Sequence, residues 1–78
     1  MAEHGSEGYS VALLGSPLAV MRAERLLREQ GLAVKAIPVP REVSSDCGIC
    51  LRFLPADEGR IRELLGQHGV GIVGVHEL

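Results

Sequence analysis

The chain has 78 residues, of which 46% are hydrophobic and 23% are charged, and its formal net charge at pH 7 is −2. This composition is that of one folded domain and excludes an intrinsically disordered chain. One Tyr and one Phe are too few for a base-stacking platform, and eight basic residues against ten acidic ones do not give the basic footprint of a protein that binds a nucleic-acid backbone. We therefore expect no nucleic-acid partner.

The sequence predicts neither a membrane span nor a secretory signal. No apolar run approaches the about 18 residues of a membrane span, and the start MAEHGSEG lacks the basic and apolar regions of a secretory signal. We expect a flexible tail at residues 1–8, a single domain at residues 9–78, a cytoplasmic location and no membrane partner. In that reducing compartment two cysteines are more often metal ligands, reactive thiols or core residues than a disulfide.

The first half of the chain predicts a strand, a helix and a strand. Residues 9–14 form an apolar run that contains Val, which indicates the first strand. The Ser-Pro pair at 16–17 starts a helix, because Ser is a good N-cap and Pro is favoured at the first helical position. Apolar residues then recur at helical spacing up to Gly31, where the helix should stop, and the charged face is expected to be solvated. Residues 32–37 indicate the second strand, which Pro38 and the next proline end.

The second half of the chain repeats this pattern. Residues 48–53 alternate in hydropathy, which predicts a strand that buries one face and carries Cys50 and Arg52 on the other. Pro55 opens a second helix, whose apolar residues recur at helical spacing. Residues 70–75 indicate the last strand.

The two halves are also similar residue by residue. When the sequence is shifted by 38 residues, identical residues coincide at equivalent places in the predicted strands and helices. These pairs are Leu13 and Leu51, Pro17 and Pro55, Arg22 and Arg60, Leu26 and Leu64, Leu27 and Leu65, and Gly31 and Gly69. Two strand–helix–strand halves predict an α+β fold of the ferredoxin-like type, βαββαβ, a two-layer sandwich with a four-stranded antiparallel sheet and both helices on one face. The other face is then uncovered, and a homodimer formed through the sheet would cover it.

The connection between the halves, residues 37–50 with the sequence IPVPREVSSDCGIC, is the candidate functional segment. It is too long for a tight hairpin, and functional residues concentrate on loops that a rigid scaffold holds. Cys47 is the candidate nucleophile, because nearby cations and hydrogen-bond donors favour the thiolate. The alternative is that Cys47 is a small buried residue at the start of a strand. The residues expected to act on this thiol are Arg41, Ser44, Ser45, Gly48 and Arg52.

Cys47 and Cys50 have the CxxC spacing of redox and zinc motifs. Here the pair leads into a predicted strand, which separates residues three apart by about 10 Å, beyond the about 7 Å that a disulfide allows between Cα atoms. Tetrahedral zinc takes four ligands, and no histidine has a second ligand at close spacing. We expect neither a redox disulfide nor a metal; a two-cysteine site completed across a dimer is the remaining alternative. The histidines are His4, His68 and His76.

Residues 40–53 read PREVSSDCGICLRF, and this stretch resembles the selenium/sulfur carrier protein-like family of small bacterial proteins. Members have a strand, a helix that ends before a Gly, a loop of the form P-R-x-[IV]-S-S-x-C-G, and an apolar strand ending in R-F. The resemblance covers about residues 9–76. The matching residues are Pro40, Arg41, Val43, Ser44, Ser45, Cys47, Gly48, Arg52 and Phe53.

The resemblance implies a carrier of sulfur or selenium, held on Cys47 as a persulfide or selenenylsulfide. Such a protein is a shuttle rather than an enzyme, needs no cofactor, and works between a cysteine desulfurase or selenium-delivery protein and an acceptor protein. Family members usually have a small apolar residue at position 50, so Cys50 would either resolve a persulfide or pack. The residues implied to shape the loop and bind the cargo are Arg41, Ser44, Ser45 and Gly48.

A second hypothesis of another class is a non-catalytic binding or regulatory module. It would dimerise through its sheet and bind a small ligand or a partner protein, and Cys47 would be inert. Thiol labelling distinguishes the two hypotheses, because a carrier thiol reacts quickly and a packed thiol does not.

Overall fold

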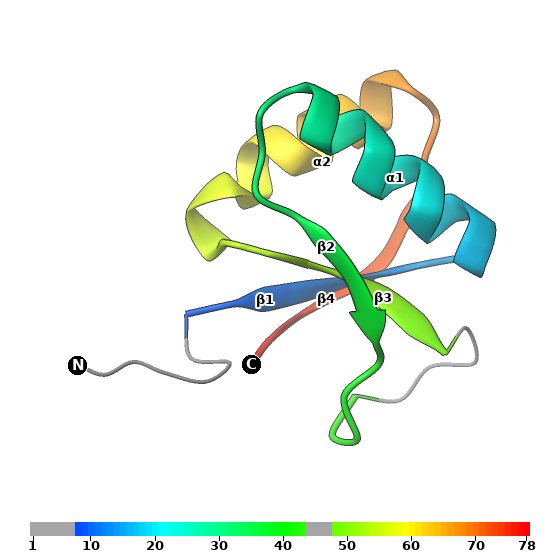
Figure 1. Ribbon diagram of the computed structural model, residues 1–78, viewed down its shortest axis with the longest axis vertical. Helices are drawn as coiled ribbons and strands as arrows, with labels where there is room; N and C mark the ends of the chain where they lie inside the picture. The colour runs from blue at the N-terminus through cyan, green and yellow to red at the C-terminus, as the bar shows by residue number, and fades with distance from the viewer. Residues whose placement is uncertain (1–7, 44–47) are drawn as a thin grey trace.

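The computed structural model describes residues 8–43 and 48–78, so nearly all of the expected N-terminal tail lies outside the described residues. The element order confirms the predicted βαββαβ arrangement of a ferredoxin-like fold (Figure 1). The sheet order is β2-β3-β1-β4, and every neighbouring pair is antiparallel. The elements are β1 (Ser10–Leu14), α1 (Pro17–Glu29), β2 (Lys35–Pro38), β3 (Ile49–Phe53), a 3₁₀ turn η1 (Pro55–Asp57), α2 (Glu58–Gln67) and β4 (Ile72–Glu77).

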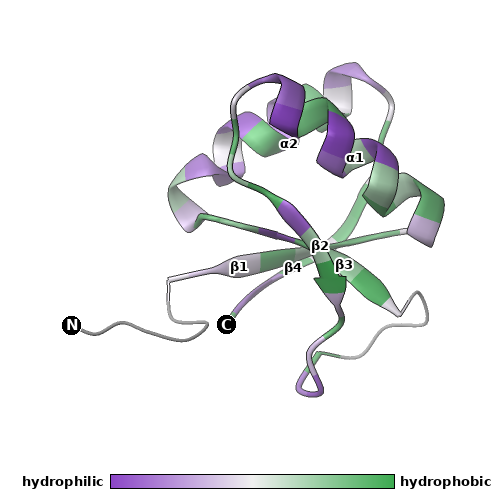
Figure 2. Ribbon diagram, viewed as in Figure 1, coloured by the Kyte–Doolittle hydropathy of each residue, from purple (hydrophilic) through white to green (hydrophobic). Residues whose placement is uncertain are grey.

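Both helices cover one face of the sheet, as Figure 1 shows. The main core lies between these layers, and Figure 2 shows hydrophobic residues along much of the strands and alternating hydrophobic and hydrophilic residues along the helices. All five residues of β1 are buried, so this central strand is covered on both faces. The core residues between helices and sheet are Ala12, Leu14, Val20, Ala23, Leu27, Val34, Leu51, Phe53, Ile61, Leu64 and Leu65.

Two strands begin later than the sequence pattern predicts. β2 starts at Lys35 rather than at residue 32, and β4 starts at Ile72 rather than at residue 70. The reason is the same in both halves: the backbone N–H of Leu32 and that of Val70 donate to the last turn of the preceding helix and cannot join a strand ladder. β4 in turn extends to Glu77, which pairs with the first residue of β1.

The two helices begin differently. In α1 the Ser16 hydroxyl accepts a hydrogen bond of 3.1 Å from the backbone N–H of Ala19, and Pro17 is the first helical residue, as predicted. The residue equivalent to Ser16 is Leu54, which has no side-chain acceptor. The second helix is therefore preceded by the 3₁₀ turn η1, in which the Asp57 N–H donates to the Leu54 carbonyl at 2.8 Å.

The helix ends show the internal repeat directly. After α1 the N–H groups of residues 30, 31 and 32 donate to the carbonyls of residues 27, 28 and 27, and after α2 the same three bonds recur 38 residues later. Both sets are Schellman caps, in which Gly31 (φ +84°) and Gly69 (φ +72°) supply the left-handed residue. The sequence repeat is thus a repeat of helix-capping geometry.

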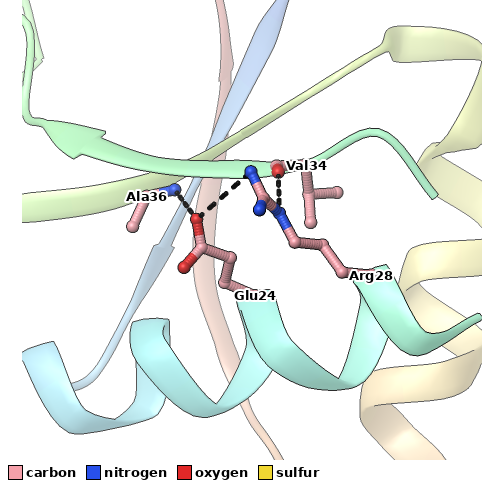
Figure 3. Close-up of polar contacts among 4 residues, drawn as sticks. All are labelled: Glu24, Arg28, Val34 and Ala36. Atoms are coloured by element: carbon pink, nitrogen blue, oxygen red, sulfur yellow. Dashed lines mark hydrogen bonds and ion pairs between the residues drawn. The ribbon is translucent and has the colours of Figure 1, made fainter. Parts of the chain in front are cut away.

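The charged face of α1 is not only solvated, contrary to the expectation from sequence. The Glu24 carboxylate accepts a hydrogen bond of 2.8 Å from the Ala36 N–H, and the Arg28 Nε donates to the Val34 carbonyl at 3.0 Å (Figure 3). The guanidinium of Arg28 lies 3.9 Å from the same Glu24 oxygen. These two side chains tie α1 to the edge strand β2, and each charge-assisted hydrogen bond is worth about 1.5–3 kcal/mol.

No helix in the part of the chain that the structure describes is long and apolar enough to cross a membrane.

The cap at Gly31 gives a test of the helix ends. A Cβ at Gly31 would meet nothing within 4 Å, so a Gly31→Ala substitution acts only through the positive φ and should lower the free energy of unfolding by roughly 1–2 kcal/mol. Gly66 is also in open space but lies within α2, so Gly66→Ala should raise that free energy by about 0.5–1 kcal/mol. Urea denaturation measures both. Equal effects of the two substitutions would contradict the capping role.

Candidate functional site

The connection from β2 to β3 is held at both ends. The Val39 N–H donates to the Gly48 carbonyl at 3.1 Å, which continues the β2–β3 ladder by one step beyond the strands. The Val43 N–H donates to the Pro40 carbonyl at 3.0 Å and closes a turn. Arg41 is exposed in that turn, and Figure 2 shows the tip of the turn as hydrophilic. Residues 44–47 lie outside the described residues, and with them the predicted site residues Ser44, Ser45 and Cys47.

A second, smaller core lies on the face of the sheet opposite the helices. We call it the open-face cluster. Its buried members are Val11, Leu13, Val43 and Cys50, and Ile37, Val39 and Leu78 pack against them. Val43 is only 6% exposed, so the connection itself covers this face and is anchored by an apolar side chain. Covering these residues therefore needs no second copy of the chain, and dimerisation through the sheet stays a prediction.

Cys50 lies at the centre of the open-face cluster. Its side chain is fully buried, it is opposite Ile37 of β2, and it forms no disulfide. Burial raises the pKa of the Cys50 thiol above its ordinary value, because a thiolate is poorly solvated there. Of the two roles left open for Cys50, this position supports packing over the resolution of a persulfide, since an attacking thiol has to be ionised and accessible.

Gly48 has φ +81°, a conformation that costs a residue with a Cβ about 1–2 kcal/mol. A Cβ there would meet nothing within 4 Å, so the glycine serves the backbone turn and not a close contact. This turn carries the chain from the connection into β3, immediately after Cys47. Gly48 and Arg41 therefore belong to the same connection, as the sequence predicts.

Arg52 lies apart from the described ends of the connection. It is four residues along β3 from Gly48, about 13 Å away, and its guanidinium lies over the Tyr9 ring with 4.4 Å from Cζ to the ring centroid. Cys47 lies outside the described residues, so the suggestion that Arg52 supplies charge near it stays a prediction. The sequence analysis names Val43 only as a match to the family's loop pattern and missed its anchoring role; the signal was a single apolar residue within the polar stretch REVSSD.

The histidines in the described part of the chain do not converge. His68 is the C-cap residue of α2, with its Nδ1 2.9 Å from the Leu64 carbonyl oxygen. His76 lies in β4 opposite Val11. Within residues 8–43 and 48–78 no group of three or more His, Cys, Asp or Glu side chains is arranged to hold a metal ion.

The comparison with protein families agrees with this architecture. The family model described as "Putative Se/S carrier protein-like" matches residues 9–77, almost the whole chain. The chain belongs to this family. No curated protein and no solved structure matches it.

The burial of Cys50 predicts its reactivity. In a Cys47→Ala variant Cys50 is the one remaining thiol, and it should resist alkylation by iodoacetamide in the native protein while reacting fully in urea. Cys50→Ser should lower the free energy of unfolding by about 1–3 kcal/mol, because its hydroxyl is buried among apolar side chains. Cys50→Ala is the control without a polar atom. Rapid native alkylation, or a Ser variant as stable as the Ala variant, would show that the thiol is accessible.

The raised pKa of Cys50 also predicts a pH dependence. The thiol loses its proton in the unfolded chain near its ordinary pKa of 9.0, but at a higher pH in the folded one. Its contribution to stability is complete below pH 9.0 and is lost as the pH rises through the folded pKa, with a slope of up to about 1.4 kcal/mol per pH unit. Urea denaturation of wild type and Cys50→Ala at neutral pH and about pH 10 should show the larger decline in wild type. Parallel declines would contradict the assignment.

Proposed function

We propose that this protein carries sulfur or selenium as a persulfide or selenenylsulfide on Cys47. The family match over residues 9–77 is the observation that carries the proposal, since it assigns the chain to a group described as selenium/sulfur carrier-like. In this role the protein is a shuttle without turnover of its own. Its partners are a cysteine desulfurase or a selenium-delivery protein as donor, and a protein that takes the atom as acceptor.

The choice of Cys47 as the carrier thiol rests on the burial of the other cysteine, Cys50. The chain has two cysteines, and Cys50 is fully buried with its pKa raised by that burial. A carrier thiol attacks as the thiolate and has to meet the thiol of a second protein, and Cys50 satisfies neither condition. Cys47 is the other thiol, and it stands in the family loop pattern between Ser45 and Gly48.

The described neighbours of Cys47 support a carrier on a rigid base. Val43 is anchored in the open-face cluster, and the Gly48 carbonyl accepts a hydrogen bond from the Val39 N–H at the end of the β2–β3 ladder. The chain is thus fixed on both sides of residues 44–47 by burial on one side and by a backbone hydrogen bond on the other. Arg41, in the adjacent turn, is the described cation of this connection, and a cation within a few ångströms of a thiol would favour its anionic form.

The proposed loading step is a transfer of one sulfane sulfur. The Cys47 thiolate attacks the terminal sulfur of a persulfide on the donor enzyme, a new S–S bond forms on Cys47, and the S–S bond of the donor breaks. The donor cysteine leaves as a thiolate, so the step needs no external oxidant or reductant. Unloading is the same exchange, with a thiolate of the acceptor as nucleophile and Cys47 as leaving group. Selenium would follow the same path as a selenenylsulfide.

The proposal predicts the mass of the loaded protein. After incubation with a cysteine desulfurase and cysteine, intact-mass spectrometry should show a gain of one sulfur atom on wild type. Cys47→Ala should show none, because the attacking thiol is gone. Cys50→Ala should gain the sulfur as wild type does, because a buried thiol takes no part.

The controls separate the carrier from the alternative hypothesis. The added sulfur should disappear with a reductant, as a persulfide does, and reappear on a second incubation. Loading that survives Cys47→Ala would refute the assignment of the thiol. No loading of wild type, together with slow native alkylation of Cys47, would favour a non-catalytic binding or regulatory module instead.

A further inference from the structure

A second candidate site lies at the end of the sheet where β3 ends and β2 begins. It is an open pocket of about 220 Å³. The lining contains three cationic side chains and no carboxylate, although the protein as a whole has a net charge of −2. The lining residues used below are Tyr9, Arg28, Val34, Lys35, Arg52 and Leu54.

Two of the cations lie directly opposite each other. The β2–β3 register pairs Lys35 with Arg52, so both side chains point to the same face of adjacent strands. Like charges in this position destabilise a sheet unless an anion compensates them. In the described part of the chain three arginines form ion pairs with glutamates, but no carboxylate lies within ion-pair distance of Lys35 or Arg52. Among residues 8–43 and 48–78, this like-charged pair thus has no carboxylate that compensates it.

The other contacts hold the guanidinium groups in place. The Arg52 guanidinium lies over the Tyr9 ring, with 4.4 Å from Cζ to the ring centroid, and this cation–π contact restrains its position. Arg28 is fixed by its hydrogen bond to the Val34 carbonyl, as Figure 3 shows. Its nearest carboxylate, Glu24, accepts a shorter hydrogen bond from the Ala36 N–H and approaches the Arg28 guanidinium only at 3.9 Å. The two guanidinium groups of the pocket are therefore held by contacts within the protein.

We propose that this pocket binds the phosphate group of a small molecule, or inorganic phosphate, between Lys35 and Arg52, with Arg28 at its rim. A dianion neutralises both opposed charges, and its tetrahedral oxygens accept hydrogen bonds from a guanidinium and an ammonium at once. Val34, Leu54 and the Tyr9 ring add apolar surface beside the charges, which would contact an organic group on a phosphate ester. The site lies about 13 Å along β3 from Gly48 and is independent of the proposed carrier role.

The test is an NMR titration of the isotope-labelled full chain at constant ionic strength. Sodium phosphate should shift the amide signals of Tyr9, Lys35 and Arg52 in a saturable way, with a Kd of about 1 mM. Lys35→Gln and Arg52→Gln should each weaken binding roughly tenfold. The matched control is Arg60→Gln, which removes the same charge from α2 outside the pocket and should leave the Kd unchanged.

Two further probes identify the ligand. Phenyl phosphate that binds more tightly than inorganic phosphate would point to a phosphorylated small molecule, and equal affinities would point to the free anion. Non-saturating shifts, equal binding of acetate, or equal loss of affinity in Arg60→Gln would overturn the proposal, because each would indicate unspecific charge attraction. Lys35→Gln and Arg52→Gln remove partly or fully exposed side chains, and dispersed NMR spectra verify that the variants are folded.

Discussion

The burial of β1 on both faces is the constraint on which the rest of the structure depends. Ala12 and Leu14 face the helices, while Val11 and Leu13 face the other side of the sheet, and a single helix layer can cover only the first pair. The β2–β3 connection covers the second pair, because its Val43 packs in one cluster with Val11 and Leu13. The connection that leads to the candidate thiol is therefore anchored in the second core through Val43.

Much of this architecture is predictable because its signals are local. Helix periodicity, the Ser16 cap and the glycines after both helices depend on residues a few positions apart, and these give the element order and hence the ferredoxin-like fold. The internal repeat is informative for the same reason, because equivalent capping bonds recur 38 residues apart. Two strands start later than the hydropathy pattern predicts, because each helix cap uses an N–H group that this pattern assigned to a strand. These groups belong to Leu32 and Val70.

The features that could not be predicted from the sequence depend on how the strands pair and how the elements pack in three dimensions. Alternation places Arg52 on the open face, but only the strand pairing brings Lys35 opposite it and Tyr9 beneath it. Glu24 and Arg28 have the i, i+4 spacing of an ion pair on the solvated face of a helix. Only the position of β2 over α1 lets them form hydrogen bonds with backbone groups. Alternation likewise put Cys50 on the open face, but its burial follows from the path of the connection, which places Val43 and Val39 against it.

The strand β3 joins these features, because it starts at the connection, carries Cys50 in its middle and ends beside the cationic pocket. Alternation along the strand assigns Ile49, Leu51 and Phe53 to the main core and Cys50 and Arg52 to the other face. Cys50 is thus surrounded by the same apolar residues that fix the connection, and its burial favours packing over a role as a second reactive thiol. A packed residue at this position, rather than a polar one, completes the cluster that buries Val43, the described anchor of the connection.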